Sequence, residues 1–235
     1  MHFNGIILID SIVYLRDIKM DKEKLATILK LLEENYKEAK TALVHNNPFE
    51  LLIATILSAQ CTDNQVNKVT PALFKKFPRP EDFAALSVEE LGQHVKSCGF
   101  YKTKSKNIIA TCDILVDKYN SKVPGDLESL MSLPGVGRKT ANVVLSSAFG
   151  KPAIAVDTHV FRVSNRIGIA NADDVFETEK QLMERIPKDK WSKAHHWLIY
   201  HGRQVCKARN PQCEKCFLLL YCNYGAEQHI TKSEG

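Results

Sequence analysis

Apolar residues recur every three or four positions along much of the chain, which is the spacing of one face of an α-helix. Between Asp21 and Lys40 this face consists of Leu25, Ile28, Leu29, Leu32 and Tyr36. The same spacing predicts a helix over 106–119, with Ile108, Ile109, Cys112, Leu115, Val116 and Tyr119 on one side. Two more helices are predicted at 174–186 and 190–205. Long runs of alternating apolar and polar residues are absent from the sequence, so the predicted fold class is all-α.

A buried central helix is predicted after Asn47. Asn47 is a helix-capping residue, Pro48 suits the first helical position, and Glu50 can reach back to the helix start. The residues at 51–57 are apolar on every side of this helix, which predicts that neighbouring elements enclose it. Ser87 and Glu90 form a second pair of the same capping type.

Two glycines lie between a predicted helix at 126–131 and another at 139–148, in the sequence Leu-Pro-Gly-Val-Gly-Arg-Lys-Thr-Ala (133–141). Gly135 and Gly137 predict a tight hairpin, because glycine adopts backbone angles that other residues avoid. Their lack of side chains lets backbone N–H groups near a helix N-terminus approach an anion. For a basic intracellular protein the natural anion is a nucleic-acid phosphate.

The chain has 235 residues and a formal net charge of +5, enough length for one large core or two modest ones. The mild positive charge is compatible with a polyanionic partner and equally with a lysine-rich solvated surface. Seven cysteines without an evident secretory signal predict a cytoplasmic protein whose thiols are reduced or bound to metal. The apolar run at 6–15 is interrupted by Asp10 and too short to span a bilayer, so no membrane association is expected.

Four of the cysteines lie close together near the C-terminus. Cys206, Cys213, Cys216 and Cys222 follow the spacing C-x6-C-x2-C-x5-C. Four thiolates within such a short loop can hold one metal centre. Both zinc and a [4Fe–4S] cluster accept four cysteines, so the spacing alone leaves the choice between them open.

The hairpin sequence, the later Val156-Asp157-Thr158-His159 and the four-cysteine loop resemble, in order and spacing, the endonuclease III family of DNA base-excision glycosylases. The resemblance covers about 21–222. It implies two helical lobes flanking a DNA-binding cleft: a six-helix domain at 41–151 with a helix-hairpin-helix motif, and an iron–sulfur cluster domain of 20–40 plus 152–225. Outside them lie an N-terminal extension at 1–19 and a tail at 226–235.

The resemblance also implies a [4Fe–4S] cluster on the four cysteines, and a monomer that binds double-stranded DNA containing damaged bases or abasic sites. It assigns catalysis to Lys139 and Asp157. The positive end of a helix, together with partial burial, would favour a neutral, nucleophilic Lys139 amine. Asp157 would stabilise positive charge developing on the sugar. Without the resemblance, the residues favour a phosphate contact for Lys139, and they allow an ordinary helix cap for Asp157.

Gln60 directly follows the predicted buried helix and matches the family residue that fills the space left by an extruded nucleotide. An exposed helix end is the alternative for Gln60. Phe100 aligns with a second wedge position where relatives often carry leucine, and a core position is its alternative. His159 and Arg162 either face DNA or make contacts within the protein. The full set of predicted DNA-binding residues is Gln60, Phe100, Gly135, Val136, Gly137, Arg138, His159 and Arg162.

The predicted function is a bifunctional DNA glycosylase and AP lyase of base excision repair. It would remove oxidised pyrimidines through a lysine Schiff base and cleave 3′ to the abasic site by β-elimination. Two alternatives remain at this stage. One is an adenine-mismatch DNA glycosylase, whose family usually lacks the lysine nucleophile. The other is a non-catalytic DNA-binding or redox-sensing iron–sulfur protein, in which Lys139 contacts phosphate and Asp157 only caps a helix.

Overall fold

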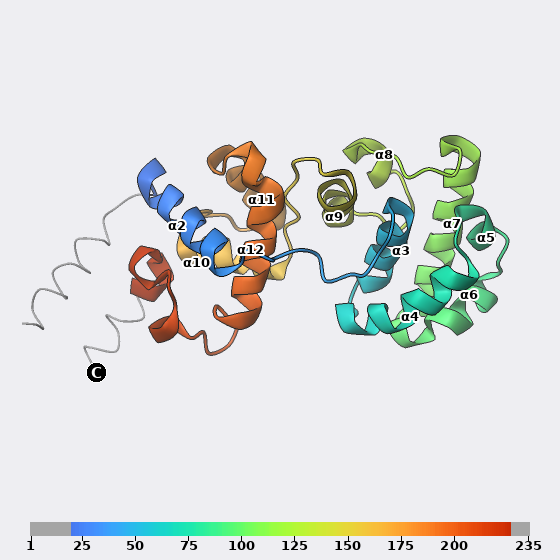
Figure 1. The fold of residues 1–235 in the computed structure, drawn as a ribbon, viewed down its shortest axis with the longest axis horizontal. Coiled ribbons are helices and arrows are strands. Elements are labelled where there is room, and N and C mark those ends of the chain that lie inside the picture. Colours follow the sequence, from blue (N-terminus) through green and yellow to red (C-terminus); the bar gives the residue numbers. More distant parts are fainter. Residues whose placement is uncertain (1–19, 227–235) are drawn as a thin grey trace, which may run out of the picture. The chain divides into compact units, whose positions relative to one another are not determined.

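A computed structural model describes residues 20–226, in which helices joined by loops are the regular secondary structure (Figure 1). The predicted extension at 1–19 lies outside the described residues, as does the predicted tail beyond residue 226. No strand occurs between residues 20 and 226, so the all-α prediction is confirmed. The α-helices are α2 (Lys22–Asn35), α3 (Pro48–Ser58), α4 (Asp63–Lys76), α5 (Pro80–Ala84), α6 (Val88–Val95), α7 (Tyr101–Tyr119), α8 (Leu127–Met131), α9 (Arg138–Phe149), α10 (Thr158–Ile167), α11 (Val175–Arg185) and α12 (Trp191–Gln204). Short 3₁₀ helices are η1 (Lys96–Cys98), η2 (Lys188–Lys190), η3 (Cys213–Lys215) and η4 (Leu219–Tyr221).

The chain divides into two compact units. One unit is the segment Lys40–Ala155, and the other combines the chain up to Ala39 with the chain from Val156 onward. The segment Lys40–Ala155 contains seven α-helices, α3 to α9, rather than the six implied by the resemblance. Helix α8 matches the helix predicted at 126–131, whereas α5 was not predicted, because a five-residue helix leaves little periodic pattern in the sequence. None of the helices within residues 20–226 is long and apolar enough to cross a membrane.

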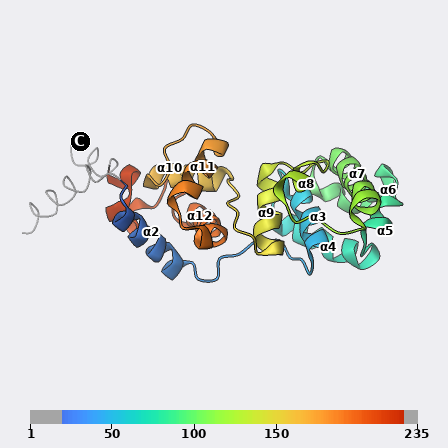
Figure 2. The same ribbon diagram turned by 90° about the horizontal axis from the view of Figure 1, so that it is seen from above.

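Helix α3 is the centre of the unit Lys40–Ala155, as its apolar sequence predicts. It packs against α4, α7 and α9 (Figures 1 and 2). Its completely buried side chains are Leu51, Leu52, Ile53, Ala54 and Leu57. Around them α7 also contacts α5 and α6, so that α7 is the second helix on which this unit is assembled.

The helix starts follow the capping prediction with one difference. The Asn47 side chain accepts a hydrogen bond from the Glu50 N–H at 2.9 Å, as expected. The Glu50 carboxylate, however, reaches past Asn47 and accepts from the backbone N–H of Asn46 at 2.7 Å. The pair at Ser87 and Glu90 is reciprocal, because each side chain accepts from the other's backbone N–H. Local sequence therefore sets where α3 and α6 begin.

In the other unit, α10 packs against α11 and α12, and α2 packs against α12. Trp197 on α12 and Ile28 and Leu32 on α2 are among its fully buried side chains. Helix α2 ends at Asn35, earlier than the predicted Lys40, because Tyr36 leaves the helical backbone. The Tyr36 hydroxyl instead makes a hydrogen bond with His201 Nδ1 at 3.0 Å, which ties the end of α2 to α12.

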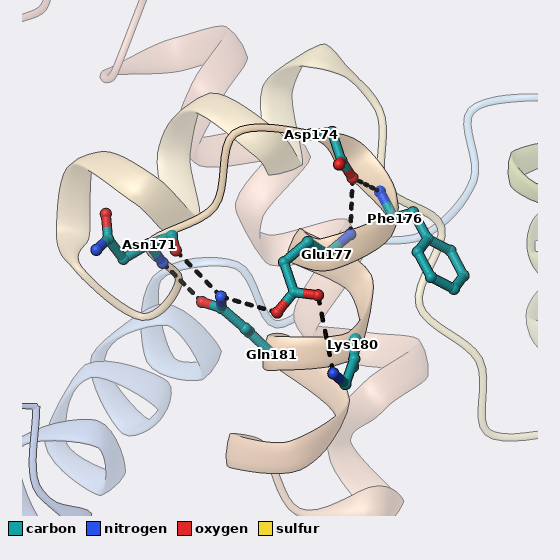
Figure 3. Close-up of polar contacts among 6 residues, drawn as sticks. All are labelled: Asn171, Asp174, Phe176, Glu177, Lys180 and Gln181. Carbon is teal, nitrogen blue, oxygen red and sulfur yellow. Dashed lines mark hydrogen bonds and ion pairs between the residues drawn. The ribbon is translucent and has the colours of Figure 1, made fainter.

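A polar network fixes the start of α11 (Figure 3). The Asp174 carboxylate accepts hydrogen bonds from the backbone N–H groups of Phe176 and Glu177, both at 2.8 Å, which confirms the predicted helix start. The Gln181 amide reaches back to Asn171, accepting from its N–H at 2.8 Å and donating to its carbonyl at 3.0 Å. The loop before α11 is thereby held to the first two turns of the helix.

Candidate functional site

The glycine hairpin joins α8 to α9 in the unit Lys40–Ala155. The Asp126 carboxylate caps α8 by accepting from the Ser129 N–H at 2.8 Å. The turn closes where the Val136 N–H donates to the Leu133 carbonyl at 3.1 Å. The side chains of Leu133 and Val136 are both buried, so Val136 offers an external ligand only its backbone. Helix, hairpin and helix therefore form one element anchored in the core, as predicted.

Helix α7 packs against the hairpin and supports it. The Thr111 hydroxyl donates to the Pro134 carbonyl at 2.9 Å. Gly135 has a φ of +77°, and a Cβ at this position would lie 3.0 Å from the Cβ and Nδ2 of Asn107. Glycine is thus required at position 135 for two reasons: the backbone is left-handed, and it approaches α7 closely. Sequence reasoning missed Asn107 and Thr111, because no local pattern marks side chains that support a distant turn.

Gly137 has a different role from Gly135. It is the N-cap of α9 with φ −86° and ψ 175°, an extended conformation that any residue adopts, so the expected need for glycine backbone freedom is wrong here. No side chain caps the first turn of α9, and no described atom lies within 4 Å of a Cβ built on Gly137. The start of α9 is consequently an open helix N-terminus at which a phosphate group can approach backbone N–H groups.

Arg138 and Lys139 are the first two residues of α9. Lys139 is exposed, so the expected partial burial of its amine is wrong. Cations at the first turn oppose the helix dipole by a few tenths of a kcal/mol, to about 1 kcal/mol each. Two such residues beside an uncapped N-terminus form a positively charged site that suits a bound anion.

Gln60 and Phe100 are both exposed and both have left-handed backbones, with φ values of 51° and 45°. Phe100 is 69% exposed, which excludes the alternative of a core position. Such backbone conformations cost about 1–3 kcal/mol each in residues other than glycine, and they persist only where surrounding contacts hold them. Gln60 and Phe100 therefore lie exposed at strained positions of the unit Lys40–Ala155, and their role as wedges stays a prediction.

In the other unit, Asp157 caps α10. One carboxylate oxygen, Oδ1, accepts hydrogen bonds from the N–H groups of His159 at 2.8 Å and Val160 at 2.9 Å. These bonds hold the half-buried carboxylate in one orientation. Both bonds fall on Oδ1, so the second oxygen keeps its acceptor capacity for another group. The cap predicted from sequence is confirmed, and it is compatible with a catalytic role.

His159 packs tightly against α12. A Cβ on Gly202 would lie 3.0 Å from the His159 Cβ, so α12 approaches α10 closely at this point. Burial lowers the pKa of His159, and the nearby guanidinium groups of Arg162 and Arg203 lower it further, whereas Asp157 opposes them. His159 is therefore a neutral side chain at neutral pH, and any contact it makes with DNA is a hydrogen bond rather than an ion pair.

The Arg162 guanidinium bridges α10 to the end of α12. It donates to the Cys206 carbonyl at 3.0 and 3.2 Å, to the Gly202 carbonyl at 3.1 Å and to the Thr158 carbonyl at 3.3 Å. The bonds to Gly202 and Cys206 satisfy carbonyl groups at the C-terminal end of α12. Contacts within the protein thus account for most of its donors, and the expected DNA contact of Arg162 stays a prediction.

The four-cysteine loop follows α12 in the same unit. Burial is the main cause that raises the pKa of the Cys222 thiol to about 12; the charges of Cys216, Cys206 and Cys213 act in the same direction, and the hydrogen bond from Gly225 opposes them. The Gly225 N–H donates to the Cys222 sulfur at 3.4 Å. Among residues 20–226 no three His, Cys, Asp or Glu side chains form a group that could hold a metal ion.

A glycine hairpin with an uncapped following helix, on an all-α chain with a four-cysteine loop, defines a helix-hairpin-helix protein of the DNA-binding class. Residues 53–188 match the model of the HhH-GPD superfamily of base excision DNA repair proteins. The chain is 54% identical over 194 residues to the Endonuclease III of Bacillus subtilis (strain 168), covering 82% of this chain and 89% of that relative. It is 49% identical over 197 residues to the Endonuclease III of Rickettsia conorii (strain ATCC VR-613 / Malish 7), covering 84% and 94%.

A solved structure described as a trapped Endonuclease III–DNA covalent intermediate, in an estranged-adenine complex, matches with a TM-score of 0.85. It is 53% identical in sequence, and the match covers 89% of this chain and 99% of that chain. The chain belongs to the endonuclease III family. It is accordingly a base excision repair enzyme, a DNA glycosylase and AP lyase, as the sequence resemblance implied.

Proposed function

We propose that Lys139 is the covalent nucleophile of this enzyme and that oxidised pyrimidines in double-stranded DNA are its substrates. The observation that carries the proposal is the position of Lys139, exposed in the first turn of an uncapped helix directly after Gly137. A phosphate bound at that N-terminus would bring the adjoining deoxyribose towards the amine. The family relative trapped as a covalent intermediate with DNA supports a covalent route.

The chemistry assigned to Lys139 takes place in three steps. The neutral amine bonds to the sugar C1′ as the N-glycosidic bond breaks, and the damaged base leaves with the bonding electron pair and takes up a proton. Opening of the sugar ring then gives a Schiff base between Lys139 and C1′. Removal of a C2′ proton finally expels the 3′ phosphate, which cuts the strand on the 3′ side of the abasic site.

Asp157 is proposed to assist the first step by electrostatics. As the base leaves, positive charge develops on the sugar, and a fixed carboxylate stabilises that charge. The two N–H bonds to Oδ1 hold the Asp157 side chain, while Oδ2 keeps its acceptor capacity. Asp157→Asn retains the cap and the side-chain shape but removes the charge. We therefore expect the Asn variant to bind DNA normally and to lose most of its turnover.

The four cysteine thiols are not gathered into a metal-binding group within residues 20–226, but their chemistry and spacing fit a [4Fe–4S] cluster. Four thiolates in one loop are the donor set that such a cluster requires, and the Gly225 N–H is placed to stabilise a thiolate at Cys222. When bound, the cluster would supply iron–thiolate cross-links within the loop. Exposed Lys207 and Arg209 lie between Cys206 and Cys213, so a loop cross-linked in this way would present them to phosphates.

Borohydride trapping tests the proposal. The full-length protein is incubated with a duplex containing thymine glycol in the presence of borohydride, and covalent adducts are separated on denaturing gels. Wild type and Lys122→Ala, which removes an exposed lysine of the same unit, are expected to form an adduct, and Lys139→Ala to form none. An adduct of undiminished yield from Lys139→Ala, or an intact oligonucleotide after prolonged exposure to wild type, would contradict the assignment.

A further inference from the structure

Lys104 on α7 is a buried cation with an unusual set of partners. Lys104 is only 5% exposed, and its ammonium donates hydrogen bonds to the Leu57 carbonyl at 2.8 Å and to the Cys98 carbonyl at 2.6 Å. No carboxylate within residues 20–226 makes an ion pair with it. Burying a charge without a counter-ion is costly, so this position calls for a specific reason.

The two carbonyl groups belong to different segments of the unit. An α-helix ends with four carbonyl groups that lack partners within the helix. At the end of α3, three of them accept hydrogen bonds from groups within residues 58–61. The fourth, that of Leu57, accepts from the Lys104 ammonium. The second acceptor, Cys98, is the last residue of η1. One ammonium therefore joins the C-terminal ends of α3 and η1.

Each of these ends leads directly to a candidate wedge residue. Gln60 lies three residues after Leu57, and Phe100 lies two residues after Cys98. Both wedge residues are exposed and left-handed, so their conformations depend on how the preceding segments are held. The backbone N–H of Lys104 also donates to the Phe100 carbonyl at 3.0 Å. Lys104 thus contacts the base of both loops at once.

The same face of α7 supports the glycine hairpin. Asn107 lies against Gly135, and Thr111 donates to the Pro134 carbonyl. Lys104, Asn107 and Thr111 follow the spacing i, i+3, i+7, which places them along one side of a helix. This side of α7 is consequently a common support for the two wedge loops and for the phosphate-binding hairpin.

We propose that Lys104 is a positioning residue that holds Gln60 and Phe100 at a fixed separation, so that both enter the duplex when the damaged nucleotide leaves it. This inference rests on the proposed function of Gln60 and Phe100 as wedges. An ammonium suits the task because it offers three donors from one atom, and carbonyl groups at a helix end carry partial negative charge. A neutral side chain of similar length, such as methionine, satisfies neither carbonyl.

Two abasic-site substrates distinguish positioning from a general role in folding. A duplex must be wedged open before the abasic nucleotide reaches the catalytic residues, whereas a single strand has no opposite base to displace. The test compares kcat/KM for cleavage of the same oligonucleotide in both forms. Lys104→Met should lower the duplex-to-single-strand ratio about tenfold or more, since it removes hydrogen bonds from a charged donor.

The control variant is Ile108→Val, a substitution of a fully buried side chain one turn further along α7. Ile108→Val should destabilise the unit but leave the ratio of kcat/KM on the duplex to kcat/KM on the single strand at the wild-type value. Lys104→Gln retains a donor for one carbonyl and gives a second folded variant in case Lys104→Met does not accumulate. It should lower the ratio less than methionine does. In a Phe100→Ala background, Lys104→Met should have a clearly smaller effect, because the residue it positions is absent.

The outcomes separate the inference from the proposed function. A wild-type enzyme that cleaves neither substrate would overturn the proposed function and the inference with it. Normal wild-type activity, with a ratio unchanged in Lys104→Met and Lys104→Gln or lowered equally in Ile108→Val, would overturn the inference alone. Additive effects of Lys104→Met and Phe100→Ala would likewise show that Lys104 does not act through Phe100.

Discussion

The two hairpin glycines have different structural roles, and an alanine substitution at each position distinguishes these roles. Gly135→Ala places a side chain on a left-handed backbone, which costs about 1–2 kcal/mol. It also places a methyl group 3.0 Å from Asn107, and overpacking of this kind costs about 1–3 kcal/mol. We therefore expect the free energy of unfolding to fall by about 2–5 kcal/mol. Gly137→Ala meets no described atom within 4 Å and needs no unusual backbone, so its effect on stability should stay within about 1 kcal/mol.

Gly150 supplies the matched control for Gly135. It ends α9 with a φ of +61°, and a Cβ there would meet no described atom within 4 Å. Gly150→Ala should thus carry the backbone cost alone, about 1–2 kcal/mol. Urea unfolding followed by circular dichroism measures all three variants. Equal losses for Gly135→Ala and Gly150→Ala would refute the argument that the hairpin rests closely on Asn107.

DNA binding completes the comparison for Gly137. Affinity is measured with a duplex carrying a reduced abasic-site analogue, which cannot form a Schiff base. Gly137→Ala should weaken binding about tenfold, because its methyl group occupies space that a phosphate needs at the start of α9. Gly150→Ala, at the opposite end of the same helix, should bind as wild type does. Unchanged affinity in Gly137→Ala would refute the assignment of this helix N-terminus to phosphate.

Three further predictions concern the other unit. Arg162→Lys, which keeps the charge but loses the planar fork, should lower the free energy of unfolding by about 2 kcal/mol in urea titrations, since carbonyl groups of Gly202 and Cys206 lose donors. Burial lowers the pKa of His196 from 6.5 to about 4. Between these pH values the folded protein therefore binds fewer protons than the unfolded chain, and its free energy of unfolding should fall by up to about 3 kcal/mol as the pH decreases through this range. His196→Gln should remove this part of the pH dependence of urea unfolding. Cys213→Ser should be purified without iron or sulfide, and amide exchange should quicken in the four-cysteine loop but not in α3.

Local signals predicted most of the helix starts and the hairpin. Asn47, Ser87 and Asp157 act within three residues of themselves, so a single sequence carries the whole interaction. The apolar run of α3 likewise identified the central helix, because a helix that is apolar on every side must be enclosed. Predictions of this kind depend on neighbours along the chain and do not require knowledge of the fold.

The supporting contacts could not be predicted in this way. Lysine is almost never fully buried, so Lys104 in a helix with charged neighbours resembles a surface residue until Leu57 and Cys98 are brought to it. Arg162 presents the same problem, because its acceptors lie about forty positions further along the chain. Both side chains satisfy carbonyl groups at helix ends, and sequence patterns do not reveal which distant donor reaches a given carbonyl.

The candidate DNA-contacting residues of the unit Lys40–Ala155 are easier to identify from energetically unfavourable features of the structure than from sequence pattern. Gln60 and Phe100 occupy backbone conformations that their side chains disfavour, and Phe100 exposes an aromatic ring to solvent. Arg138 and Lys139 place positive charge where the dipole of α9 opposes it. Each feature lowers the stability of the free protein, and a bound duplex would offset two of them, since bases would cover the ring and phosphates would neutralise the charge. Retaining four such conflicts in one unit is most simply explained by a polyanionic partner with stacked, aromatic bases.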